Sequence, residues 1–217
     1  MCGVPCERSQ PPRWYDVALT TVYYSHFVVA LGTGGVLWVR SRTQWIHYMR
    51  LYVSLSAFAL VVYVLYPMAP PWMAARDGYI SPAVHRITGR GWYDLGQSHG
   101  SGGAHEQISA VGNQVAAMPS LHAALALFVA VYALRHLRTR WRWTLPLYPL
   151  TMSFMLVYYA EHYVVDVLAG YAAVALVMSG WARWDRRQRH RGAGQQAGGT
   201  QQPSRRACMT SSTGVSA

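Results

Sequence analysis

Long runs of apolar residues divide the chain into candidate membrane-spanning helices. A helix needs about 20 apolar residues to cross a hydrocarbon core about 30 Å thick. The runs that reach or approach this length are Val17–Val39, Leu51–Pro67, Pro119–Leu134, Trp143–Tyr159 and Tyr163–Trp181. The last three are near the lower limit, which leaves a soluble bundle of buried helices as the alternative. Because the runs lack the charged outer stripe of such a bundle, the pattern predicts an all-α, polytopic transmembrane helix bundle with five visible spans.

Arginines gather in the connections that follow alternate spans. The three clusters are Arg40, Arg42 and Arg50; Arg135, Arg138, Arg140 and Arg142; and Arg183, Arg186, Arg187, Arg189 and Arg191. Basic residues are enriched in cytoplasmic loops, so these clusters and the C-terminus are predicted to be cytoplasmic. The opposite, outer face then receives residues 1–16, the segment 68–118 and the turn Ala160–His162.

Composition explains what the positive charge does. The chain is 52% hydrophobic and 12% charged, and its 19 basic residues, all arginine, outnumber 8 acids to give a net charge of +11. Divided by predicted side, the charge is +13 in the cytoplasm and −2 outside. Since orientation accounts for the clusters and no nucleic-acid motif accompanies them, no nucleic-acid partner is expected. Anionic lipid at the cytoplasmic face remains a candidate partner, and the arrangement favours a bacterial plasma membrane.

The sequence predicts three parts. Residues 1–16 form an outer N-terminal segment, residues 17–182 a membrane-embedded domain with the outer loop 68–118, and residues 183–217 a disordered, basic cytoplasmic tail. Five spans with an inner C-terminus place the N-terminus outside, although residues 1–16 contain no apolar signal-peptide core. Either this short segment is translocated with the first span, or a sixth span precedes it in a longer product; the second interpretation is favoured.

Ionisable residues near a membrane boundary are candidates for chemistry because burying them is costly. His162 and Asp166 are four residues apart, so on a helix they share one face, and Gly170 continues that face. His122 lies just after Ser120 at the start of the third span, where free helix N–H groups favour an anion. The predicted topology brings both histidines and the carboxylate to the outer face.

Several interpretations of these residues stay open. Each histidine could be a hydrogen-bonded packing residue within the bundle. The His162 and Asp166 pair could ligate a metal, but only His122 is an obvious third ligand, so no metal site is assigned. A hydrolase triad on Ser120 is disfavoured because Ser120 and His122 point to different helix faces. The residues suit best a nucleophilic imidazole held by a carboxylate, with a second imidazole as acid.

The motif PSLH at Pro119–His122, followed by HYVVD at His162–Asp166, resembles the second and third signatures of the type 2 phosphatidic acid phosphatase superfamily. With the preceding methionine and the earlier APPWM at Ala69–Met73, it resembles the inositol phosphorylceramide synthase-like branch. The resemblance covers residues 14–182. It implies a six-helix membrane core, whose first helix is missing from the visible spans, and phosphoryl chemistry that needs no metal or other cofactor.

The resemblance also implies roles for individual residues. His162 would be the nucleophile that forms a phosphohistidine, and Asp166 would orient it and stabilise its charge. His122 would protonate the leaving alkoxide. Ser120 and nearby backbone N–H groups would contact the phosphate.

The chain departs from the family pattern where cations should bind phosphate. The first signature, which begins with lysine, is absent, and Met155 and Leu156 stand where a Ser-Arg pair would precede the nucleophile. A phosphoryl group needs positive charge against it in the transition state. The remaining candidates for phosphate binding lie in the outer loop: Arg76, Arg86 and Arg90, with Asn113 as a further hydrogen-bonding group.

The sequence therefore predicts an integral membrane enzyme that moves a phosphoryl or phospho-polyol group on a lipid phosphate substrate at the outer face. A polyol acceptor, which the branch resemblance favours, makes the enzyme an inositolphosphotransferase-like protein; a water acceptor makes it a lipid phosphate phosphatase. A non-catalytic transporter or scaffold is the alternative from another class. The donor, the acceptor and the oligomeric state are left open.

Overall fold

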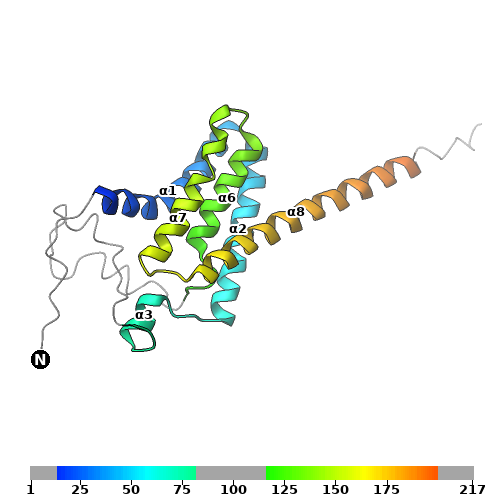
Figure 1. The fold of residues 1–217 in the computed structure, drawn as a ribbon. Helices are drawn as coiled ribbons and strands as arrows, with labels where there is room; N and C mark the ends of the chain where they lie inside the picture. The colour runs from blue at the N-terminus through cyan, green and yellow to red at the C-terminus, as the bar shows by residue number, and fades with distance from the viewer. Residues whose placement is uncertain (1–13, 82–115, 200–217) are drawn as a thin grey trace, which may run out of the picture. The chain divides into compact units, whose positions relative to one another are not determined.

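A computed structural model describes residues 14–81 and 116–199, with side chains to residue 192, and this part of the chain is built from helices (Figure 1). The elements are α1 (Trp14–Arg40), α2 (Arg42–Leu65), α3 (Pro71–Arg76), α6 (Leu121–His136), the 3-10 helix η2 (Arg140–Thr144), α7 (Leu147–Tyr158) and α8 (Val164–Gly199). A single isolated parallel bridge joins Met68 to Ala116 among these residues. The chain divides into two compact units after Val177, and every residue of the site described below lies in the first.

Helix α6 is the centre of the first unit. It packs against α1, α2 and α7, and α1 packs in turn against α2 and α7. The core cluster contains Ala123, Ala126, Met152, Met155, Leu156, Tyr159 and Val167. Because the α6 members are alanines, neighbouring helix backbones can approach closely, which is how helices associate where lipid removes the hydrophobic driving force.

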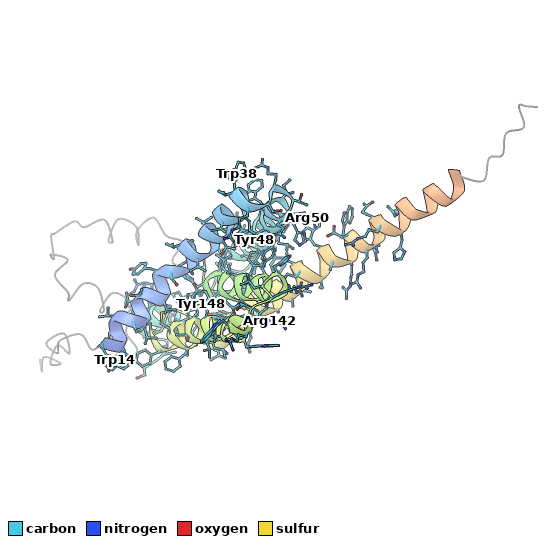
Figure 2. The ribbon with its side chains drawn as sticks, turned by 90° about the horizontal axis from the view of Figure 1, so that it is seen from above. Trp14, Trp38, Tyr48, Arg50, Arg142 and Tyr148 are labelled. Carbon is cyan, nitrogen blue, oxygen red and sulfur yellow. The ribbon has the colours of Figure 1, made fainter. Side chains whose placement is uncertain are left out.

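The predicted fold class is confirmed: the protein is an all-α membrane bundle. Among the described residues, α1, α2 and the Val164–Gly192 part of α8 are long and apolar enough to cross a membrane. Trp14 and Trp38 are labelled near the two ends of α1 in Figure 2, and their side chains are 81% and 51% exposed. Tryptophans at both ends of a span are typical of the two membrane interfaces.

Of the five predicted spans, the fourth is shorter than expected and the third is as short as predicted. Each of the five apolar runs lies on a helix, but α6 has 16 residues and α7 has 12. At 1.5 Å per residue these helices are about 24 and about 18 Å long, less than a hydrocarbon core of about 30 Å. The fourth span begins later than predicted, at Leu147, because the first residues of that run form the separate helix η2 and Pro146 precedes α7.

The connection between the first two spans is shorter than predicted, because α2 begins at Arg42. Ser41 alone separates the helices, and its hydroxyl oxygen accepts a hydrogen bond from the Gln44 N–H at 3.4 Å. The Arg42 guanidinium lies 3.6 Å from the ring centroid of Trp38 and 4.3 Å from that of Trp45. Apolar hydropathy finds the membrane core of a helix but not the polar turns that extend it, since arginine is itself a good helix former.

The first residues of the predicted disordered tail are helical. Helix α8 continues to Gly199, so residues 183–199 correct that prediction, while residues 200–217 lie outside the described part of the chain. The run after the apolar core is rich in Arg and Gln, which favour helix. The Arg186 Nε also donates to the Ala182 carbonyl at 3.2 Å, four residues earlier. Polar composition therefore ended the membrane core here without ending the helix.

Candidate functional site

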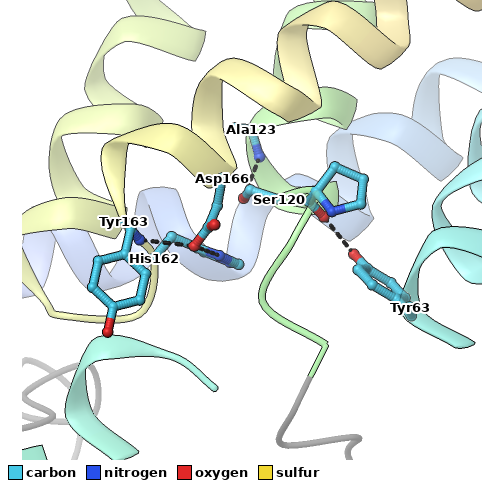
Figure 3. Close-up of polar contacts among 7 residues, drawn as sticks. Tyr63, Ser120, Ala123, His162, Tyr163 and Asp166 are labelled. Atoms are coloured by element: carbon cyan, nitrogen blue, oxygen red, sulfur yellow. Dashed lines mark hydrogen bonds and ion pairs between the residues drawn. The ribbon is translucent and has the colours of Figure 1, made fainter. Parts of the chain in front are cut away.

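The site lies where the first turns of α6 and α8 meet (Figure 3). The Ser120 N–H, just before α6, donates to the Asp166 carbonyl of α8 at 2.9 Å. Gly170 makes this approach possible, because a Cβ at that position would lie 2.5 Å from the Ser120 carbonyl oxygen. The structure thus identifies the partner of the small residue predicted to allow close helix packing.

His162 and Asp166 form a buried pair. His162 Nδ1 lies 3.6 Å from Asp166 Oδ2, and the residues are 6% and 0% exposed. The same Oδ2 accepts a hydrogen bond from the Tyr163 N–H at 2.8 Å. Tyr163 immediately precedes α8 and Asp166 is its third residue, so this carboxylate caps the helix as the acidic member of a capping box does. One side chain therefore both fixes the start of α8 and faces the histidine.

Two atoms of this pair are poorly satisfied. His162 Nδ1 and Asp166 Oδ1 are among the buried side-chain atoms of the described chain that make no hydrogen bond. Such atoms are costly in a protein interior and call for an explanation. Catalytic hydrogen bonds are often long without substrate and tighten when it binds. The 3.6 Å separation is consistent with a pair that closes on a ligand.

His122 completes the cluster. The His122 ring centroid lies 5.7 Å from that of His162. The His122 ring also contacts α1, where the Tyr23 ring stacks on it with a centroid distance of 4.9 Å and an interplanar angle of 18°. The structure brings together the two histidines and the carboxylate that the sequence placed at one face. Their catalytic roles stay a prediction.

Ser120 shapes the start of α6. It is fully buried, and its hydroxyl oxygen accepts a hydrogen bond from the Ala123 N–H at 3.4 Å, as an N-cap does. On the preceding residue, the Pro119 carbonyl accepts a hydrogen bond from the Tyr63 hydroxyl of α2 at 2.7 Å. Helices α2 and α8 therefore both hold the segment that carries His122.

Replacing Tyr63 with phenylalanine should loosen this segment. Loss of the hydroxyl leaves the Pro119 carbonyl without this hydrogen bond, so we expect the free energy of unfolding to fall by about 1 kcal/mol. Activity should fall severalfold because His122 follows this segment. Thermal unfolding and turnover in detergent measure both effects. Tyr52→Phe, a change on the same helix, is the control, and equal effects of both substitutions would contradict the assignment.

The turn that delivers His162 has a left-handed residue. Ala160 has φ of 55°, and the Glu161 and His162 N–H groups both donate to the Leu156 carbonyl, at 3.0 and 3.2 Å. The Trp72 N–H at the start of α3 donates to the Ala160 carbonyl at 3.2 Å. Helices commonly end in this way, with a left-handed residue that is most often glycine. Helix α3, from the APPWM motif, thus supports the turn before His162.

Substitutions at Ala160 should report on this turn. A β-branched residue strongly resists positive φ, so Ala160→Val should destabilise the protein by about 1–2 kcal/mol and lower activity. Ala160→Gly relieves the backbone strain and should leave stability within about 1 kcal/mol of the original protein. Paired measurements of melting temperature and turnover provide the test. A valine variant as stable and active as the glycine variant would refute the role assigned to the turn.

Arg76, a predicted phosphate ligand, is occupied elsewhere. Its side chain is exposed, its Nε donates to Asp77 Oδ1 at 2.8 Å, and its guanidinium lies 5.7 Å from the Trp72 ring centroid. The hydrogen bond from Arg76 lowers the pKa of Asp77 and raises the pKa of the arginine itself. The other predicted phosphate ligands, Arg86, Arg90 and Asn113, lie outside the described residues.

The described residues 14–81 and 116–192 contain no candidate set of metal ligands. No group of three His, Cys, Asp or Glu residues there is close enough to hold a metal ion. His122 lies beside the His162 and Asp166 pair but does not complete such a set.

Sequence reasoning missed three residues around His122. Tyr23 and His26 contact its ring from α1, and Tyr63 binds the segment before it. His26 carried a usable signal, because an ionisable residue inside an apolar span is a functional candidate by default. The two tyrosines carried none, because tyrosine is common in membrane helices and their contacts depend on which helices pack together.

Known proteins agree with the motifs. The family model of the PAP2 superfamily matches residues 9–180, which include every residue of the cluster. The chain is 27% identical over 185 residues to a phosphoinositol dihydroceramide synthase of Bacteroides thetaiotaomicron, an alignment that covers 82% of this chain. The chain spans 58% of that relative's length. No solved structure matches the chain. With its two histidines and carboxylate gathered at the paired starts of α6 and α8, the chain belongs to the PAP2 superfamily.

Proposed function

We propose that this membrane protein is a lipid phosphotransferase that works through a phosphohistidine. The observation that carries the proposal is the buried His162 and Asp166 pair, with the His122 ring 5.7 Å away. A carboxylate beside one imidazole and a second imidazole within reach are the parts needed for nucleophilic and acid catalysis. Membership of the PAP2 superfamily supports the same class of reaction.

The geometry suggests which atom of His162 reacts. Asp166 faces Nδ1, so it favours the tautomer that carries hydrogen there and leaves the Nε2 lone pair as the nucleophile. In the first step, Nε2 attacks phosphorus and a P–N bond forms while the P–O bond to the lipid breaks. His122 gives its proton to the departing alkoxide. Asp166 stabilises the positive charge that develops on His162.

The second step reverses the proton transfer. An acceptor hydroxyl gives its proton to His122 and attacks phosphorus, and the P–N bond breaks to restore neutral His162. His122 is then protonated for the next cycle, so the two steps consume no net proton. A hydroxyl of a polyol or lipid as acceptor makes the enzyme a transferase, and water makes it a lipid phosphate phosphatase.

The proposal favours transfer of a phospho-polyol group resembling inositol phosphate. Its support is the name of the relative, a phosphoinositol dihydroceramide synthase, together with the shared length of 185 residues. The positive-inside distribution supports an active site on the outer face of a bacterial plasma membrane, with the C-terminus in the cytoplasm. Anionic lipids would then meet the arginine clusters on the cytoplasmic side.

The phosphate also needs cations against its oxygens. Since Arg76 is paired with Asp77, we propose that Arg86 or Arg90 supplies this charge, with Asn113 as an additional donor. The first N–H groups of α6, at the positive end of its dipole, would add to this positive charge, and Ser120 would lie beside them. The Ser120 hydroxyl oxygen already accepts the capping hydrogen bond from the Ala123 N–H. Ser120 would therefore contact the phosphate by donating its hydroxyl hydrogen.

The test is a trapping experiment on the full chain in vesicles without divalent metal. Two substrates labelled with ³²P in the phosphate are supplied, phosphatidylinositol as the diester and phosphatidic acid as the monoester. A phosphoprotein that is labile in acid and stable in base is expected, followed by transfer to an added lipid alcohol. Release of inorganic phosphate alone identifies the phosphatase. Absence of any labelled protein or product, or activity lost with chelator, overturns the proposed mechanism.

A further inference from the structure

Arginine and tryptophan side chains gather at the end of the bundle opposite the histidine cluster. His122 lies in the first turn of α6, whereas the turn between α1 and α2 and the connection from α6 to α7 lie at the other end of this helix (Figure 1). The Tyr132 hydroxyl, in the last turns of α6, donates to the Gln44 carbonyl in the first turn of α2 at 3.2 Å. This hydrogen bond ties the two connections together.

We propose that the side chains at this end form a binding site for the phosphate of anionic phospholipids. The inference goes beyond the proposed reaction and does not depend on it. The members come from α1, α2 and η2, and we call them the arginine–tryptophan surface: Trp38, Arg42, Trp45, Trp141, Arg142 and Trp143.

Arg42 contacts two tryptophans at once. Its guanidinium lies 3.6 Å from the Trp38 ring centroid and 4.3 Å from that of Trp45, and the two rings meet edge to face with centroids 4.5 Å apart. Both distances are within the range of cation–π attraction, for which tryptophan is the best partner. The rings hold the guanidinium over their faces, while its N–H groups lie in its own plane. A held, planar guanidinium is suited to bind a phosphate through two parallel hydrogen bonds.

Helix η2 repeats the pairing of arginine with tryptophan. The Arg142 guanidinium lies 4.9 Å from the Trp143 ring centroid. Trp141 and Trp143 are 71% and 70% exposed, although both are large and largely apolar. Indole rings of this kind are enriched where the hydrocarbon core meets the lipid headgroups. We therefore expect η2 to lie at the depth of the headgroups, with its arginine among their phosphates.

The charge of this region has one sign. No acidic residue occurs between Asp16 and Asp77 or between Glu106 and Glu161, so arginine supplies every charged side chain of the two segments that form the surface. Such a region attracts anions. Because α1 and α2 are long enough to cross a membrane and both end here, phospholipid phosphate is the anion at hand. Anionic lipids are favoured over zwitterionic ones, whose phosphate is already neutralised by the cation of the same headgroup.

Single substitutions separate a built site from diffuse attraction. Arg42→Gln removes the held guanidinium, and Arg42→Lys keeps the charge but loses the planar set of donors. Trp38→Leu keeps every charge and removes a ring face. The matched control is Arg40→Gln, which removes the same charge from an exposed arginine two residues away that does not belong to the surface.

Native mass spectrometry of the full chain in detergent gives the affinity for the first bound lipid. The protein should bind phosphatidylglycerol at least about fivefold more tightly than phosphatidylcholine with the same acyl chains. We expect the affinity for phosphatidylglycerol to fall about fivefold in Arg42→Gln and about threefold in Trp38→Leu and Arg42→Lys. Arg40→Gln should change this affinity less than about 1.5-fold, because an exposed charge is screened.

The measurement needs no turnover, so it separates this inference from the proposed function. Equal affinity for the two lipids would overturn the inference. Equal losses in Arg40→Gln and Arg42→Gln, or an unchanged affinity in Trp38→Leu, would also overturn it, because the attraction would then be diffuse. Displacement of phosphatidylglycerol by inorganic phosphate or by a single-stranded oligonucleotide, at matched ionic strength, would assign the surface to a soluble anion instead. If both Arg42 variants failed to fold while Arg40→Gln folded, Arg42 would be structural and the inference wrong.

Discussion

His162→Gln is expected to abolish the phosphoenzyme and to lower kcat on the order of 10³-fold or more. The glutamine amide cannot form the P–N bond, so the variant has no nucleophile beside Asp166. Glutamine is chosen because it approximates the length and polarity of the imidazole in a buried site. Labelled protein after denaturing electrophoresis and turnover in vesicles are the two measurements.

The control for this experiment is His190→Gln, at an exposed position in α8. It should retain both the label and the turnover. Elution as a single species in detergent would show that the His162 variant is folded. A variant that still forms an acid-labile phosphoprotein would place the nucleophile elsewhere, and full activity without any label would exclude a covalent intermediate.

Gly170→Ala should produce the second largest loss, although the glycine has no reactive atom. The added Cβ would lie 2.5 Å from the Ser120 carbonyl oxygen and 3.5 Å from the Ala124 nitrogen, both of them backbone atoms. Since backbone cannot rotate away as a side chain can, α8 must move from the start of α6. We expect about 1–3 kcal/mol of destabilisation from overpacking and at least a roughly tenfold loss of turnover from misplaced catalytic groups.

Gly180→Ala is a matched control on the same helix. A Cβ at Gly180 meets no atom within 4 Å, and alanine favours helix over glycine. This variant should be equally or more stable and fully active. Thermal unfolding and turnover of the two variants, measured together, test the packing argument. If Gly170→Ala were as stable and active as Gly180→Ala, the close approach of α6 and α8 would have no functional role.

Apolar length predicted the helices well and their ends poorly. A run such as Val17–Val39 must be helical in lipid because every backbone N–H and C=O needs a partner within its own segment. That requirement says nothing about where the helix stops in the polar region. Arg42 and the arginines after Trp181 therefore lie in helices, because local propensity and capping decide the structure there.

Local spacing predicted part of the site, and helix pairing decided the rest. His162 and Asp166 are one helical turn apart, so sequence alone places them together. The contact between His26 and His122 joins positions 26 and 122, and nothing in either local pattern specifies it. Gly170 shows the intermediate case, since a small residue indicates that some backbone approaches but not that Ser120 is the partner.

The two contacts of one Asp166 oxygen couple the start of α8 to the orientation of the nucleophile. Oδ2 accepts from the Tyr163 N–H and faces His162, so losing this oxygen would weaken a helix start and a charge interaction together. Asp166→Ala should therefore fray the opening turn of α8 as His162 loses its orienting partner. Asp166→Asn keeps an amide oxygen that can accept from the Tyr163 N–H, so it should preserve the helix start and lose only the negative charge beside His162.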